Sequence, residues 1–116
     1  MKEISYILQG CFWFSIGHVL AFYQLNGQFI WKWFKDNEFI VAAAGIFLSY
    51  AYMYGTRDTV AGFDGLLWPA RFVGFGIGMI IYALMVHFYF AEELTPKTIV
   101  SLVISVVLIY IQVGWK

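Results

Sequence analysis

The sequence predicts an all-α integral membrane protein, a bundle of four transmembrane helices, from its composition and from four long apolar runs. Of its 116 residues, 62% are hydrophobic and 12% are charged. Soluble domains are about half apolar and about a quarter charged, so this chain has too few charges to cover a water-exposed surface. The runs are continuous, whereas the strands of a membrane barrel alternate over about 10 residues. We therefore expect a single transmembrane domain over residues 1–116.

Each run approaches the length of about 20 apolar residues that a helix needs to cross a hydrocarbon core about 30 Å thick. The expected helices cover about residues 4–25, 39–55, 68–91 and 97–115. The first run exceeds the apolar region of a signal peptide and lacks a small-residue cleavage site before Gln24-Leu25-Asn26, so we expect a retained helix.

Two of the connections are predicted as polar surface segments. Asn26–Glu38 contains Trp31 and Trp33 alternating with Lys32, a pattern typical of the lipid headgroup layer. Thr56–Gly65 is rich in turn-forming residues and is predicted as a loop.

The third connection is short and carries helix-start signals. Thr95 is expected to cap the fourth helix, and Pro96 suits its first position. So short a link predicts that the third and fourth helices form an antiparallel hairpin.

The loop charges give a small orientation bias. If both ends of the chain lie on one side, that side carries four cations and the other carries three: Lys2, Arg57, Arg71 and Lys116 against Lys32, Lys35 and Lys97. The positive-inside rule then places both termini in the cytoplasm, and we expect a bacterial-type inner (cytoplasmic) membrane. So near a balance equally permits insertion in both orientations.

Small residues mark helix-packing faces. Gly74 and Gly78 form a GxxxG pattern, which lets helix backbones approach closely in lipid, and Gly76 adds flexibility or a second contact face. Packing within the chain and a dimer contact both remain open. On the second helix we expect a packing stripe and then a set of interface-anchoring tyrosines: Ala42, Gly45 and Ser49, then Tyr50, Tyr52 and Tyr54.

Ionisable residues are costly inside a bilayer, so His18, the deepest on the first helix, marks a candidate site. It shares a helix face with Cys11 and Ser15. One hypothesis is that His18 lines a cavity and binds or relays a proton. The alternative is a neutral histidine that hydrogen-bonds to a neighbouring helix. The candidate substrate pathway comprises His18 with Ser15, and Trp13 and Phe14 as groove walls.

Other polar residues indicate no catalytic or metal centre. His18 and His87 lack metal-ligand spacing, and Glu92 and Glu93 are interpreted as solvated loop charges. Arg71 is interpreted as snorkelling to the headgroups, with an anionic substrate as the alternative. No GxSxG, phosphate-binding glycine loop or Cys-x-x-Cys is present in the sequence. We therefore expect no enzyme activity, no cofactor and no metal, and the equal numbers of basic and acidic residues indicate no nucleic-acid partner.

The order of these features resembles the small multidrug resistance family, four-helix members of the drug/metabolite transporter superfamily. The resemblance rests on a glycine pair, a short acidic turn, the helix that follows and two glycine positions on the first helix: Gly76-Ile77-Gly78, Phe90–Pro96, Ile99–Ile111, Gly10 and Ser15-Ile16-Gly17. It implies a four-helix transporter fold. The proton-coupled exporters carry a glutamate on the first helix, and no acid lies between Ile4 and Leu25 here. Drug export is therefore not carried over, although some relatives without that acid serve as subunits of lipid-linked sugar flippases.

Our leading hypothesis is a small transporter-like protein that moves a small solute or lipid headgroup as a dimer. The alternative is a non-catalytic accessory subunit of a larger membrane complex. A third hypothesis is a pore-forming holin-type protein, and no feature of the sequence requires it. The expected partners are the lipid bilayer and either a second copy or another membrane subunit.

Overall fold

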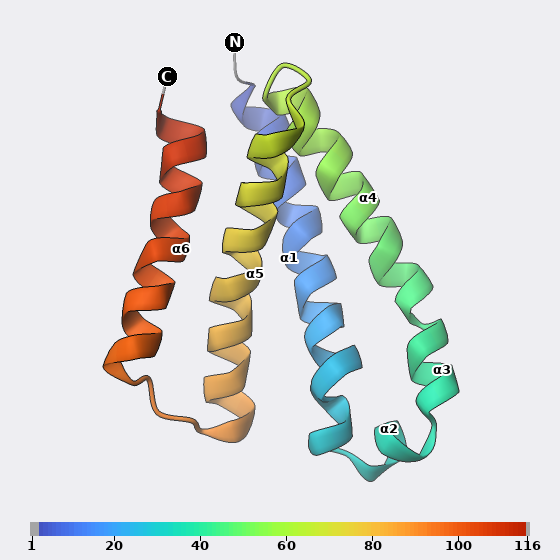
Figure 1. Cartoon of the computed structure of the whole chain (residues 1–116). Coiled ribbons are helices and arrows are strands. Elements are labelled where there is room, and N and C mark those ends of the chain that lie inside the picture. The colour runs from blue at the N-terminus through green and yellow to red at the C-terminus, as the bar shows by residue number, and fades with distance from the viewer. Residues whose placement is uncertain (1–2, 116) are drawn as a thin grey trace.

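Residues 3–115 are described in a computed structural model, and every regular element among them is a helix (Figure 1). Four helical segments are long and apolar enough to cross a membrane, which confirms the expected four-span class. They are α1 (Ile4–Asn26) with the 3-10 turn η1 (Gly27–Phe29), α3 (Glu38–Ala43) with α4 (Gly45–Gly62), α5 (Leu67–Phe90), and α6 (Pro96–Gly114). The short helix α2 (Lys32–Asp36) connects the first two crossings.

The helices alternate in direction, so α1 begins and α6 ends at the same end of the bundle (Figure 1). That arrangement agrees with placing both ends of the chain on one side. Lys2 and Lys116, which contribute to the expected charge bias, lie outside the described residues.

The prediction of a loop over Thr56–Gly65 is wrong for most of these residues, because α4 continues to Gly62. The chain reverses only at Asp64 and Gly65, whose φ angles are 57° and 87°. Burial explains the difference: Thr59 is fully buried against α1, and packing of this kind overrides a weak local helix preference.

The backbones of α1 and α4 lie in direct contact. A Cβ added at Gly10 would overlap the Thr59 side chain and lie 3.0 Å from the Gly55 carbonyl oxygen. A Cβ added at Gly62 would lie 3.0 Å from the backbone nitrogen of Ile7. Lipid supplies no hydrophobic force between helices, so this close approach is what holds them together.

The packing stripe of the second crossing is not the one that the sequence predicted. Ala42 and Ser49 are exposed, so that expectation is wrong for them. The buried face of α4 starts further along the helix and consists of Ala51, Gly55, Thr59 and Gly62. Both stripes have helical spacing, and only the second lies where α1 crosses α4.

Gly45 belongs to a different contact, at the break between α3 and α4. The side-chain amide of Gln24 donates to the carbonyl oxygens of Val41 at 3.3 Å and Ala42 at 3.4 Å. A Cβ at Gly45 would lie 2.6 Å from the Gln24 amide nitrogen. Gly45 therefore leaves room for α1 to supply hydrogen bonds to backbone carbonyls at an irregular point of the membrane crossing.

Helices α5 and α6 form the expected antiparallel hairpin (Figure 1). Thr95 caps α6 as predicted, since its hydroxyl accepts a hydrogen bond from the Thr98 backbone N–H at 3.2 Å, and Pro96 opens the helix. A Cβ at Gly76 would lie 2.9 Å from the Ser105 carbonyl oxygen, so Gly76 fixes the contact between the two helices.

The bundle is flat, with principal extents of 48 × 35 × 18 Å. Helices α1, α4 and α5 pack against one another, and α6 stands on the outer side of α5 (Figure 1). A helix with its side chains is about 10–12 Å across, so a layer 18 Å thick encloses no continuous lumen. A pathway for a solute must therefore run along a surface of the bundle or be completed by a second polypeptide.

We predict that Gly10→Ala lowers the free energy of unfolding by about 1–3 kcal/mol, because overpacking would force the α1 and α4 backbones apart. Unfolding in mixed micelles, titrated with a denaturing detergent, measures the effect. Gln9→Ala, at the exposed neighbouring position, is the control and should change stability little. Equal stability of the two variants would contradict the close contact.

Candidate functional site

His18 lies where α1, α4 and α5 meet. Its Nε2 is 2.9 Å from the Gly74 carbonyl oxygen on α5, and its Nδ1 is 3.3 Å from the Tyr52 hydroxyl on α4. A carbonyl only accepts, so Nε2–H is the donor to Gly74, and in a neutral ring Nδ1 accepts from the Tyr52 O–H. The imidazole and the Tyr52 ring also meet edge to face at 5.2 Å. One side chain thus joins three helices.

Glycines make room for this junction. A Cβ at Gly78 would overlap the imidazole of His18, and one at Gly17 would lie 2.8 Å from the Tyr52 ring. A Cβ at Gly74 would lie 3.2 Å from the ring of Phe14, which is buried. The GxxxG face of α5 therefore receives aromatic side chains from α1 of the same chain.

All three candidate packing glycines of α5 contact neighbouring helices within the chain. Gly74 and Gly78 face α1, and Gly76 faces α6. These contacts occupy the glycine faces. A dimer stays a prediction, and its contact surface would lie elsewhere on the bundle.

A cavity of about 320 Å³ lies beside His18, between α4 and α5, and we call it the α4/α5 crevice. Phe14 and His18 of α1 form part of its lining, and Tyr52 and Thr56 line it from α4. From α5 it is lined by Ala70, Arg71, Gly74 and Phe75. An imidazole, a phenol, a hydroxyl and a guanidinium group thus border one hollow. This arrangement can bind a polar group by hydrogen bonds and charge.

The structure brings two of the four sequence-derived pathway candidates into the crevice. Phe14 and His18 are four residues apart and share a helix face. Trp13 instead packs on the ring of Tyr54, with centroids 5.1 Å apart. The Ser15 hydroxyl donates to the Cys11 carbonyl oxygen of its own helix at 2.8 Å. Trp13 and Ser15 are therefore not among the residues that line the crevice.

Three polar residues of the crevice were not assigned to the substrate pathway from the sequence. Tyr52 was expected to anchor at the membrane interface, and Thr56 was expected in a loop. For Arg71 the sequence favoured snorkelling, with binding of an anionic substrate as the alternative, and its charge close to an apolar run was a usable signal. The alternate spacing of Tyr50, Tyr52 and Tyr54 on a helix was a second signal, because such side chains cannot all share one face.

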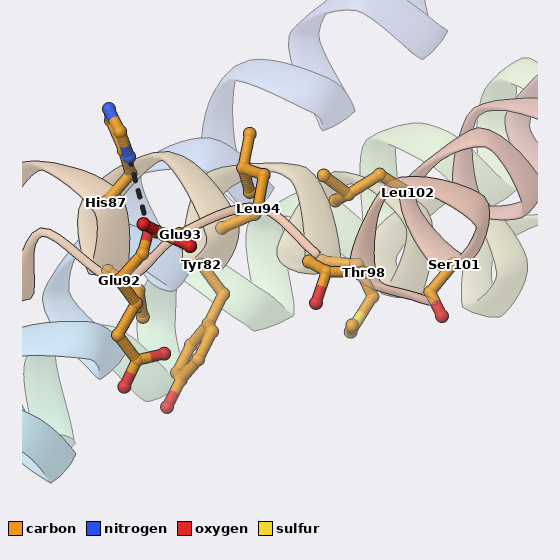
Figure 2. A pocket seen from close by; sticks show the side chains of 11 residues that line it. Tyr82, His87, Glu92, Glu93, Leu94, Thr98, Ser101 and Leu102 are labelled. Atoms are coloured by element: carbon orange, nitrogen blue, oxygen red, sulfur yellow. Dashed lines mark hydrogen bonds between the residues drawn. The ribbon is translucent and has the colours of Figure 1, made fainter. Parts of the chain in front are cut away.

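A second cavity of about 210 Å³ lies at the opposite end of α5, where the chain turns into α6 (Figure 2). Its lining includes Tyr82, His87, Glu92 and Ser101. The Nδ1 of His87 is 3.4 Å from the Glu92 carbonyl oxygen, which ties the end of α5 to the connection (Figure 2). Within residues 3–115 no three His, Cys, Asp or Glu side chains gather in a way that could hold a metal ion.

Comparison with known proteins identifies no relative: no family model, no curated protein and no solved structure matches the chain. The four long apolar helices are those of the integral membrane class. The function of the chain has to be inferred from the geometry of the crevice.

We predict that Gly78→Ala is destabilising because its methyl group would meet the imidazole, and that His18→Ala relieves this effect. Gly78→Ala alone should lower the free energy of unfolding by about 1–3 kcal/mol. In the double variant the two effects should deviate from additivity by about 1 kcal/mol or more. Unfolding in mixed micelles measures all four members of the cycle.

Gly76→Ala is the matched control for this cycle. Gly76 lies on the same helix and faces α6 rather than His18. Its effect should therefore add to that of His18→Ala. Additivity in the Gly78 cycle would contradict the contact between His18 and Gly78.

Proposed function

We propose that the chain is a small transporter-like membrane protein that moves a small solute or a lipid headgroup along the α4/α5 crevice. The observation that carries the proposal is the cluster of polar lining groups from His18, Tyr52, Thr56 and Arg71. Polar and charged side chains within membrane segments are costly, and they generally face a cavity, a partner or a transport route. The crevice supplies such a route beside an apolar bundle.

We propose further that the working unit is a dimer. The smallest extent of a single copy is 18 Å, and its crevice is partly open rather than enclosed. Small transporters commonly place the binding site between two halves, and a second copy would supply the missing wall. The resemblance to the small multidrug resistance family agrees with this arrangement, and the missing acid on α1 argues against proton-coupled drug export. A bacterial-type inner membrane with cytoplasmic termini belongs to the same proposal.

An accessory subunit of a larger membrane complex is the second candidate, and α6 is the observation that favours it. Among the described residues, α6 packs chiefly on α5 and leaves most of its surface uncovered. Its exposed residues include Val103, Ile104, Val107 and Tyr110. An uncovered β-branched face suits a neighbouring membrane subunit as well as lipid.

We predict that Thr56→Phe reduces transport at least about tenfold, because the added ring would fill the crevice. Purified protein in vesicles is assayed for headgroup-labelled lipid by dithionite bleaching, and for loss of entrapped polar solutes. Ala61→Phe, at an exposed position of the same helix that borders neither described cavity, is the control and should keep the wild-type rate. Wild-type rates equal to those of protein-free vesicles in both assays would contradict the transport proposal.

Gentle extraction from the native membrane separates the two candidate functions. A homodimeric mass would support the transporter. Co-elution in fixed proportion with larger unrelated subunits would support the accessory role and would contradict the dimer.

A further inference from the structure

We propose that the α4/α5 crevice binds the phosphate group of an anionic amphiphile, with the Arg71 guanidinium as its anchor. This inference rests on the proposed function and deepens it, because it names the chemical class of the headgroup. It follows from the charge, the hydrogen-bond donors and the opening of the crevice.

The first observation is the position and charge of Arg71. It lies in the second turn of α5, three residues before Gly74, whose carbonyl accepts from His18. A helix rises about 1.5 Å per residue, so Arg71 stands about one turn before Gly74 and about two turns before Gly78, the two residues of α5 that contact the imidazole. Its side chain borders the crevice, and no acidic residue is part of that lining.

A second cation lies on the α4 side of the same opening. Arg57 borders a shallow groove that shares Tyr52 and Thr56 with the crevice. Its guanidinium lies over the Tyr54 ring, 5.2 Å from the centroid, which holds it near α4. The two arginines are the only arginines of the chain, and both border this region. Of the residues that the structure describes, no acidic one lines the crevice or this groove, so the charged groups that border them directly are cationic.

The donor set favours a phosphate. A guanidinium group presents several N–H donors in a planar fork, which matches two oxygens of a phosphate or carboxylate. Thr56 adds a hydroxyl on the opposite wall, and His18 and Tyr52 already bond to each other deeper in the crevice. Phosphate has further oxygens left to reach Thr56 while Arg71 holds two of them. A cavity of about 320 Å³ has space for a small headgroup.

The apolar part of the lining indicates an amphiphile rather than a free ion. Phe75 is exposed beside the crevice, on the same helix as Arg71 and four residues after it. A molecule with its phosphate at Arg71 can lay its tail over Phe75 and into the hydrocarbon. A fully hydrated ion gains nothing from that surface. Along α5 the charged residue Arg71 thus comes before the apolar residue Phe75. This order matches an anionic lipid, whose charged headgroup is followed by an apolar tail.

The test is a binding titration of the full chain in neutral detergent micelles, by calorimetry, with short-chain phosphatidic acid, short-chain phosphatidylcholine and inorganic phosphate. We expect phosphatidic acid to bind and Arg71→Gln to weaken it about tenfold or more, as for the loss of a charge-assisted hydrogen-bond pair. Lys97→Gln, which removes one charge at the opposite end of the bundle, is the matched control and should bind like the wild type. Phosphatidylcholine should bind more weakly, because its choline group opposes the cations.

Affinity for phosphatidic acid within twofold of wild type in a folded Arg71→Gln variant would overturn the inference. So would an equal loss in Lys97→Gln, which would reveal a general charge effect. Equally tight binding of inorganic phosphate, still lost in Arg71→Gln, would retain the phosphate site and identify a free ion as its source. Binding of phosphatidic acid alone would identify the amphiphile.

Wild-type protein provides an independent measurement if Arg71→Gln does not fold. Phosphatidic acid should slow the modification of Arg71 by phenylglyoxal several-fold, as located by peptide mass spectrometry. An unchanged rate would overturn the inference. The binding experiments need no translocation, so failure of transport with Arg71-dependent binding would reject the proposed function alone. Transport without Arg71-dependent binding would reject the phosphate site alone.

Discussion

The close contact between the α1 and α4 backbones is the constraint on which the rest of the structure depends. Within a bilayer the lipid tails are as apolar as the side chains, so packing quality and hydrogen bonds decide how helices associate. Gly10 on α1, and Gly55 and Gly62 on α4, permit an approach that any side chain would prevent. Once that contact is fixed, Tyr52 lies against Gly17 and points toward His18.

The same contact explains why a polar crevice exists in so small a bundle. Both α4 and α5 pack on α1, and aromatic side chains of α1 fill the glycine notches of α5. The space that remains between α4 and α5 is bordered by His18 and Arg71. A histidine at this depth is tolerable because both ring nitrogens have partners. The two hypotheses for His18 are therefore compatible at the level of structure: it bonds to neighbouring helices and it also lines a cavity.

The architecture was predictable wherever composition or local chemistry decides it. Continuous apolar runs predicted four helical spans, and Thr95 with Pro96 correctly predicted the start of α6. The end of α4 was not predictable, because Thr56 to Gly62 reads as a turn-rich segment and is helical through its burial against α1. The glycines of α5 were recognised as packing residues, but spacing alone does not say which helix each one meets.

The candidate site was predicted in part for a similar reason. His18 stands out because a histidine within an apolar run is costly, and Phe14 shares its face. Tyr52 and Thr56 become part of the crevice only through the long α4 and its contact with α1. The charge of Arg71, near the start of a membrane helix, could be recognised from the sequence. Its two interpretations, snorkelling and binding of an anionic substrate, differ in whether the guanidinium faces the headgroups or a cavity. The structure places the crevice there.

Thiol accessibility tests the central claim, a polar crevice beside α1, most directly. Cys11 is the only cysteine, so Cys11→Ala gives a background without thiols. Thr56→Cys in that background should react readily with a polar, membrane-impermeant methanethiosulfonate in native vesicles. Val107→Cys, an exposed position about two turns before the end of α6, should react slowly because it faces lipid. Equal, slow reaction at both positions would show that the crevice is not reached from water and would contradict the account.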